Sequence, residues 1–421
     1  MKLVPADGSG GRAASAVIGL LLSSPAWAEP GEHITAGDAV IVPGIAVGVQ
    51  YTNNAYHVET VTPESGAANL KVSPGVELRL NRDDLDVNLS GAYSLHKYFT
   101  AETTALDRYD DFSINGNIDA LKKSRIGLRL NEGVGIQNFP VDAESDAHPY
   151  TKQFRNQTTA AVAARPGSAL EFSAGAKYVL DDYGTPASAH EDGTRHYNTR
   201  NAIGPTGNVT WQLLPRTAVT ADFEWEHAAY VNSTIETPQG DTLSFPDHNM
   251  WRLTGGLRGR VIDRLTVTAI VGYGAADYDE TTVPGADAAA AADLTGLQHL
   301  VFDAGFRYDL SENDKFNIGV TKNFRDSFFT NYVSYLRAYA STDLRFAKRV
   351  GLDGEFGISP EQFRGQETRD DIVLDAKLDA TYFIREWVWI TAGGTWQERS
   401  SSDTSVQFDE FSGHLTATVN Y

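Results

Sequence analysis

Apolar and polar residues alternate along most of this chain, in segments of about ten residues. The clearest is DIVLDAKLDATY, residues 371–382, where Ile372 and Leu374 lie on one row and Asp371 and Asp375 on the other. Because successive side chains of a β-strand point to opposite faces, each segment predicts a strand with one apolar and one polar face. About eighteen such segments follow one another.

The links between these segments alternate in length. Short links such as NRDD, LKKS and VIDR alternate with longer acidic or polar ones such as VDAESDAHPY and NSTIETPQGDTLSFPD. Outer-membrane barrels have short periplasmic turns and long extracellular loops. We therefore expect an all-β fold, a transmembrane antiparallel up-and-down β-barrel of about 18 strands with both termini in the periplasm.

Aromatic residues on the apolar rows support this interpretation, because Tyr and Trp gather at the two bilayer interfaces. One expected belt lies near the short-turn ends of the strands, and the other lies near the long-loop ends. The first belt comprises Trp211, Tyr308, Phe346, Tyr382 and Tyr421, and the second comprises Tyr51, Tyr93, Tyr178, Trp225, Tyr273 and Trp396.

A large soluble all-β protein, either a propeller or a double sandwich, is the alternative fold, since alternating strands are equally expected there. The chain shows no blade repeat, and nothing in a soluble fold requires links of alternating length. The barrel is therefore the favoured prediction.

Residues 1–28 have the pattern of a secretory signal. Lys2 and Arg12 provide the positive start, AASAVIGLLLSSP the apolar centre, and Ala26-Trp27-Ala28 the cleavage site. We expect residues 29–41 to form a short periplasmic segment and residues 42–421 the barrel. The predicted location is the bacterial outer membrane.

Composition excludes several other classes. After the signal, no stretch approaches the roughly 20 apolar residues of a membrane-spanning helix. The chain has no cysteine, which excludes thiol catalysis and thiolate metal sites. A formal net charge of -20 argues against nucleic acid as a partner. Lipid and lipopolysaccharide of the outer membrane are the partners that a barrel implies, and the acidic loops could bind the latter through divalent cations.

The last strand ends on an aromatic residue. It resembles the signal by which the outer-membrane assembly machinery selects its clients, with Tyr421 at the end, Val419 two residues before it and His414 seven before it. The glycine usual five residues before the end is Thr416 here. This machinery is therefore an expected partner.

A barrel of about eighteen strands is wide enough for an aqueous channel, so function would reside in inward side chains and loops. The lumen-lining candidates are Arg252, Arg258, Arg260, Asp222, Glu224, Glu226, Tyr335, Arg337, Tyr339, Arg345, Asp375, Lys377 and Asp379. Their charges could pair across strands and stiffen the wall. They could also offer partners to a hydrated sugar chain in transit, and both roles are compatible.

No sequence motif predicts catalysis, a cofactor or a metal site. HEDGTRH, residues 190–196, lacks the histidine spacing and the helix of a metalloprotease and is better interpreted as a solvated loop. The acidic residues Asp277 to Glu280, with Asp287, lack the positional pattern of a calcium loop.

The segment from Phe302 to Ile358, with its RYDL and FRDS pieces, resembles the putative β-barrel porin type 2 family encoded in exopolysaccharide gene clusters. The resemblance implies an outer-membrane channel that exports an exopolysaccharide or capsular polysaccharide, working with a periplasmic export protein. It assigns no role to a numbered residue.

Two further hypotheses remain open. A general or sugar-selective diffusion porin would need a constriction inside the lumen, for which residues 277–296 are the expected candidate. An outer-membrane lipid-modifying enzyme would need a Ser/His pair at the lipid-facing rim, where His227 is the outward histidine. A channel without enzymatic activity is the favoured prediction.

Overall fold

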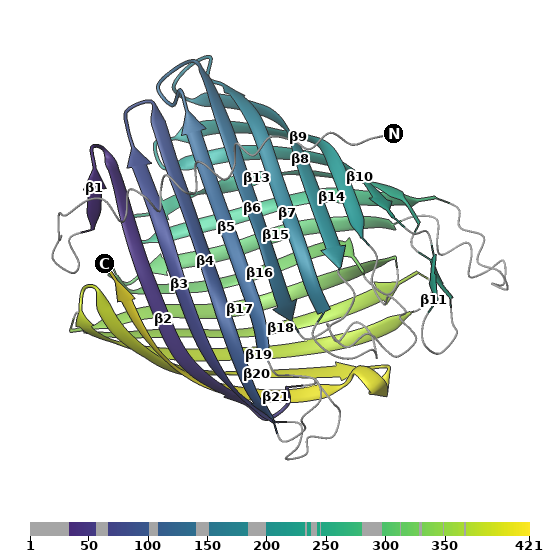
Figure 1. Ribbon diagram of the computed structural model, residues 1–421. Helices are drawn as coiled ribbons and strands as arrows, with labels where there is room; N and C mark the ends of the chain where they lie inside the picture. The colour runs from purple at the N-terminus through teal and green to yellow at the C-terminus, as the bar shows by residue number, and fades with distance from the viewer. Residues whose placement is uncertain are drawn as a thin grey trace, which may run out of the picture.

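A closed ring of antiparallel strands makes up the protein (Figure 1). The computed structural model describes residues 33–55, 66–100, 108–139, 151–183, 199–231, 234–236, 242–244, 246–279, 297–311, 313–327, 331–347, 349–365 and 368–421. In this part of the chain, no helix is long and apolar enough to cross a membrane.

Eighteen long strands form the barrel wall, as the alternation predicts. They are β2 (Ala39–Thr52), β3 (Ala67–Asn81), β4 (Leu85–Thr100), β5 (Arg108–Ala120), β6 (Ile126–Phe139), β7 (Thr151–Ala164), β8 (Leu170–Tyr183), β9 (Arg200–Leu214), β10 (Thr217–Tyr230), β13 (His248–Ile262), β14 (Leu265–Tyr278), β15 (Leu297–Asp309), β16 (Lys315–Asp326), β17 (Tyr332–Phe346), β18 (Val350–Arg364), β19 (Arg369–Arg385), β20 (Val388–Ser401) and β21 (Phe408–Asn420).

Three short strands and one 3-10 turn complete the described elements. They are β1 (Ile34–Ala36), β11 (Thr234–Glu236), β12 (Thr242–Ser244) and η2 (Thr404–Val406). The strand β1 and the C-terminus lie at one rim of the barrel, and the β11–β12 hairpin lies at the other (Figure 1).

The first and last wall strands close the ring. The ladder between β2 and β21 runs from the Gly44–Asn420 pair to the Thr52–Ser412 pair. Every neighbouring pair of wall strands is antiparallel, and every pair other than β2 and β21 is consecutive among the wall strands in sequence. The barrel thereby avoids the open sheet edge that lipid does not tolerate.

The two rims differ in the length of their links, as predicted. Eight links, of two to five residues each, join β3 to β4, β5 to β6 and so on, and we call their side the short-turn rim. The other links run from four to 18 residues and define the long-loop rim. The fold class expected from the sequence is therefore confirmed.

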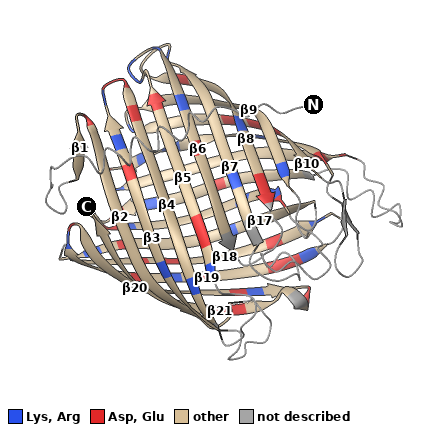
Figure 2. Ribbon diagram, viewed as in Figure 1, with Lys and Arg blue, Asp and Glu red and all other residues tan. Residues whose placement is uncertain are grey.

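The outer surface carries the apolar row of each strand. On β2, Val47, Val49 and Tyr51 are exposed, the last two by 53% and 54%. Aromatic side chains on this row are exposed near the short-turn rim at Trp211 and Phe346. Charged residues of both signs are interspersed along the strands (Figure 2). The apolar surface thus faces outward, toward lipid, as a barrel requires.

The outward row is not apolar throughout. Glu132 of β6 lies on it, opposite Gly116 of β5 and Thr158 of β7. Asn156 Nδ2 donates to Glu132 Oε1 at 2.7 Å, and the Thr158 hydroxyl donates to Glu132 Oε2 at 2.6 Å. Both carboxyl oxygens therefore have partners, which lowers the cost of placing this group at a lipid-facing position.

The barrel wall begins earlier than the sequence indicated. Residues 29–41 were expected to precede it, yet β2 starts at Ala39. Ala39 and Ile41 pair with Leu80 and Leu78 of β3, and β1 folds back on the same residues through a turn at Gly37. Gly37 has φ +65°, a left-handed conformation that glycine adopts without steric cost. The predicted signal, residues 1–28, lies outside the described residues.

A hydrogen-bonded turn at the short-turn rim gives a pH-dependent prediction. The carboxylate of Asp314 accepts from the backbone N–H of Arg345 at 2.7 Å and from the Ser311 hydroxyl at 2.7 Å. These donors hold the pKa of Asp314 below its ordinary value of 3.8. Its contribution to stability is therefore present above the unfolded pKa and is lost as the pH falls through the folded pKa.

We expect Asp314→Asn to unfold at lower urea concentration than the parent protein at pH 7, when both are folded in lipid vesicles. The difference should shrink at pH 3, because this pH lies below the ordinary pKa of 3.8, at which the unfolded chain takes up the proton. Ser311→Ala, which removes one of the two donors, should show a smaller difference with the same pH trend. A difference that persists unchanged at pH 3 would contradict the carboxylate explanation.

Candidate functional site: the barrel lumen

The residues predicted to line the lumen lie on the inward row of their strands, opposite the exposed apolar row. They come from four strands of the wall. They are Asp222, Glu224 and Glu226 on β10; Arg252, Arg258 and Arg260 on β13; Tyr335, Arg337, Tyr339 and Arg345 on β17; and Asp375, Lys377 and Asp379 on β19.

Most of these charges pair with neighbours on the wall. Arg337 makes a two-point contact with Asp375 at 2.7 and 2.9 Å and also donates to Glu355 at 2.8 Å, so it bridges β17, β18 and β19. Lys177 of β8 lies 2.5 Å from Glu224 of β10. Such pairs fix the wall and leave a lumen lined with both signs of charge.

Three of the predicted arginines behave differently. Arg258 donates to the Thr268 hydroxyl at 3.4 Å, and Arg260 lies 3.5 Å from Asp309. Arg345 places its guanidinium carbon 4.6 Å from the centre of the Phe383 ring. All three lie toward the short-turn rim, and of them only Arg260 has a carboxylate partner among the described residues.

The hairpin formed by β16 and β17 leaves the wall near the long-loop rim. The ladder between β15 and β16 ends at the Phe302–Lys322 pair. In contrast, β15 stays paired with β14 as far as Leu297, and β16 stays paired with β17 as far as Asp326. The end of the hairpin is thus not paired with β15.

The outward row of this hairpin packs against the inner wall. Phe324 would clash with a Cβ atom on Gly274 of β14, and its ring is only 3% exposed. Arg252 of β13 lies with its guanidinium carbon 5.1 Å from the centre of the Phe324 ring and donates to the Phe324 carbonyl at 3.4 Å. The hairpin therefore folds into the lumen and lies over β13 and β14.

A cluster of charged residues fixes the hairpin in this position. Asp326 at the end of β16 lies 2.5 Å from Arg200 of β9 and 3.0 Å from Nε2 of His248 on β13. Arg200 also pairs with Glu226 of β10 and lies 3.8 Å from Asp181 of β8. Because β10, β13, β14 and β15 separate β9 from β16 in the ring, this contact holds the hairpin inside the barrel, over the inner face of these strands, and narrows the lumen.

The strap, as we call residues 323–327 and 331–334 of this hairpin, was not predicted from the sequence. The expected constriction, residues 277–296, lies mostly outside the described residues, and only its first three residues are described. A usable signal was present in the pattern, because Lys322, Asp326 and Ser334 occupy positions of the lipid-facing row. These three residues lie near the end of one hairpin, and unlike Glu132 they are not a single group with partners on the next wall strand.

The other chemical candidates do not form a catalytic or metal site in the described part of the chain. His227 lies on the outward row, and its Nδ1 is 3.1 Å from the side-chain oxygen of Asn249 rather than a serine hydroxyl. No group of three His, Asp or Glu residues is placed to hold a metal ion among the described residues. HEDGTRH, residues 190–196, falls outside them.

The predicted assembly signal lies in β21, at the closing seam. Val419 pairs with Ile45, and the backbone N–H of Tyr421 donates to the carbonyl of Pro43 at 2.8 Å. His414 faces inward, with Nε2 3.5 Å from Asp379. Recognition of these residues by the assembly machinery stays a prediction.

A sealed antiparallel ring with an apolar exterior and a charged lumen defines a porin-type barrel of the outer membrane. The chain belongs to the family described as putative beta-barrel porin 2, which matches residues 30–421. The family expected from the sequence is therefore confirmed. A search of curated proteins finds no match.

Similar solved structures come from two bacteria. OpdK of Pseudomonas aeruginosa is 10% identical, with 90% of this chain and 98% of that chain covered and a TM-score of 0.46. OpdL of the same organism is 13% identical, with 92% and 99% covered and a TM-score of 0.46. OccAB3 of Acinetobacter baumannii is 9% identical, with 92% and 100% covered and a TM-score of 0.46.

Proposed function

We propose that this protein is a passive diffusion porin for small hydrophilic solutes. The observation that carries the proposal is the contact between Asp326 and Arg200, which holds the strap inside the lumen, over the inner face of the wall. A solute must pass beside this strap, so size would limit what crosses. The paired charges of the wall would keep the path hydrated without a single tight site, which transit requires.

This proposal differs from polysaccharide export, which the family resemblance implies. A hydrated polymer needs a wide path along the whole barrel, whereas the strap removes part of the section at the long-loop rim. The small-solute alternative is therefore better supported by the geometry. We further propose that the short-turn rim, with both termini, faces the periplasm and that the long loops face outward.

Liposome swelling tests the proposed function directly. The purified barrel, reconstituted in vesicles, should admit a monosaccharide several times faster than a trisaccharide, because the strap restricts the larger solute more. Vesicles that contain the heat-unfolded protein provide the control. Exclusion of the monosaccharide would contradict the proposal. Loss of surface polysaccharide on deletion of the gene, with the barrel closed to small sugars, would favour export instead.

A further inference from the structure

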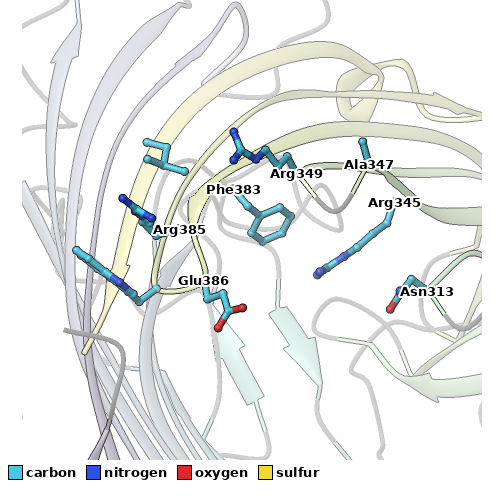
Figure 3. A pocket seen from close by; sticks show the side chains of 9 residues that line it. Asn313, Arg345, Ala347, Arg349, Phe383, Arg385 and Glu386 are labelled. Atoms are coloured by element: carbon cyan, nitrogen blue, oxygen red, sulfur yellow. The ribbon is translucent and has the colours of Figure 1, made fainter. Parts of the chain in front are cut away.

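A cavity of about 1000 Å³ opens at the short-turn rim, between the β17–β18 turn and the β19–β20 turn. We call it the rim pocket. The Phe383 ring and the side chains of Arg345 and Asn313 project into the same space, with Arg349, Arg385 and Glu386 around it (Figure 3). It lies at the opposite end of the barrel from the strap.

The rim pocket has an excess of positive charge. Arg345, Arg349 and Arg385 line it and are exposed, against a single carboxylate, Glu386. No carboxylate among the described residues lies within ion-pair distance of these three guanidinium groups. The lining residues thus carry a formal charge of about +2 beside an aqueous lumen, which attracts anions.

A second group of arginines at the same rim differs from the rim pocket in its ion pairs. Arg216, Arg258 and Arg260 line a smaller cavity of about 400 Å³ beside the β9–β10 turn. There, however, Arg216 pairs with Asp263 at 2.7 Å, and Arg260 lies 3.5 Å from Asp309. Two of those three arginines thus have carboxylate partners within the protein, whereas the guanidinium groups of the rim pocket remain available to a ligand.

The rim pocket also has an apolar, ordered floor. The Arg345 guanidinium lies over the Phe383 ring at 4.6 Å, and Phe383 lies 6.3 Å from the Trp389 ring. The backbone N–H of Arg345 donates to Asp314, which fixes the strand that carries this arginine. Ile384 and Trp387 add apolar surface to the lining. Cationic groups above an aromatic floor fit a ligand with an anionic head and an apolar body.

We propose that the rim pocket binds small organic carboxylates with an apolar ring as body. Guanidinium groups receive a carboxylate in a planar two-point contact, and Phe383 and Trp387 cover the ring. This inference rests on the proposed function, because a solute in transit would meet the pocket at the mouth of the lumen. It names the substrate class that the barrel concentrates there.

Binding of benzoate to the detergent-solubilised barrel tests the assignment, with benzyl alcohol as the uncharged analogue. Isothermal titration should show saturable benzoate binding, at least tenfold weaker for benzyl alcohol. Arg345→Gln combined with Arg385→Gln should weaken benzoate binding tenfold or more. Arg216→Gln, at the paired arginines of the same rim, should change it less than twofold.

Two results would overturn the proposal: equal affinity for benzoate and benzyl alcohol, or unchanged benzoate binding by the double variant. Gel electrophoresis of unheated and heated samples shows whether the double variant is folded, because a folded variant should show the same heat-dependent change in mobility as the parent. Arg345→Lys combined with Arg385→Lys should retain part of the affinity, because lysine keeps the positive charge but cannot make the planar two-point contact. Because this titration measures no flux, benzoate binding can hold while liposome swelling fails, and the reverse, so the two proposals are tested separately.

Discussion

Asp326→Asn is expected to raise the single-channel conductance of the barrel in planar bilayers at least twofold. The substitution removes the charge that Arg200 and His248 contact, at 2.5 and 3.0 Å. A hydrogen bond to a charged group contributes about 1.5–3 kcal/mol and one to a neutral amide about 0.5–1.5 kcal/mol, so losing the charge should favour release of the strap by roughly tenfold or more. A released strap leaves the lumen wider.

Asp326→Glu is the matched control for this experiment, since it keeps the charge and lengthens the side chain by one carbon. We expect its conductance to stay close to that of the parent. Phe324→Ala should act in the same direction as Asp326→Asn, because it removes the ring that packs over Gly274. Parent-like conductance in a folded Asp326→Asn barrel would show that the strap does not limit the current.

The second large effect is expected at Arg337, where one guanidinium neutralises two carboxylates of the wall. In Arg337→Gln, Asp375 and Glu355 lose their partner and leave an added negative charge in the lumen. Two unit charges about 4 Å apart in water interact by about 1 kcal/mol, which is roughly a fivefold change in local ion concentration. The reversal potential in a salt gradient should therefore shift toward cation selectivity.

Arg337→Lys separates charge from geometry in that measurement. It keeps the positive charge but cannot make the planar two-point contact with Asp375, so ion selectivity should stay near the parent value. High salt should reduce the difference between Arg337→Gln and the parent, because screening shortens the range of lumen charges. An unchanged reversal potential in Arg337→Gln would indicate that ions pass elsewhere in the lumen.

The strand pattern was readable from the sequence because each wall strand has two different environments along its whole length. The row with Val47 and Val49 faces lipid, and the neighbouring row faces water, so hydrophobicity reports the side of the wall directly. The short turns were equally readable, since a two-residue link between antiparallel strands leaves little freedom. Glu132 departs from the pattern because its partners, Asn156 and Thr158, lie on the next strand.

The constriction was not readable in the same way. The position of the strap depends on contacts between β16 and strands that are up to five places away in the ring, such as the pair of Asp326 with Arg200. Alternation predicts which face of the strand a residue occupies, but not that a hairpin has turned that face toward the inner side of β13 and β14. Likewise, Arg337 reaches across β18 to Asp375, a choice that register alone does not fix.

The seam between β2 and β21 joins the first and last strands of the wall, so the wall itself has no beginning. The carbonyl oxygen of Tyr421 lies 3.0 Å from Nδ1 of His33, which brings the two ends of the described chain together. A circularly permuted chain, with these ends linked and a new opening at one of the tight turns, would retain every ladder. The architecture of the barrel would thus not depend on the order in which its strands are synthesised.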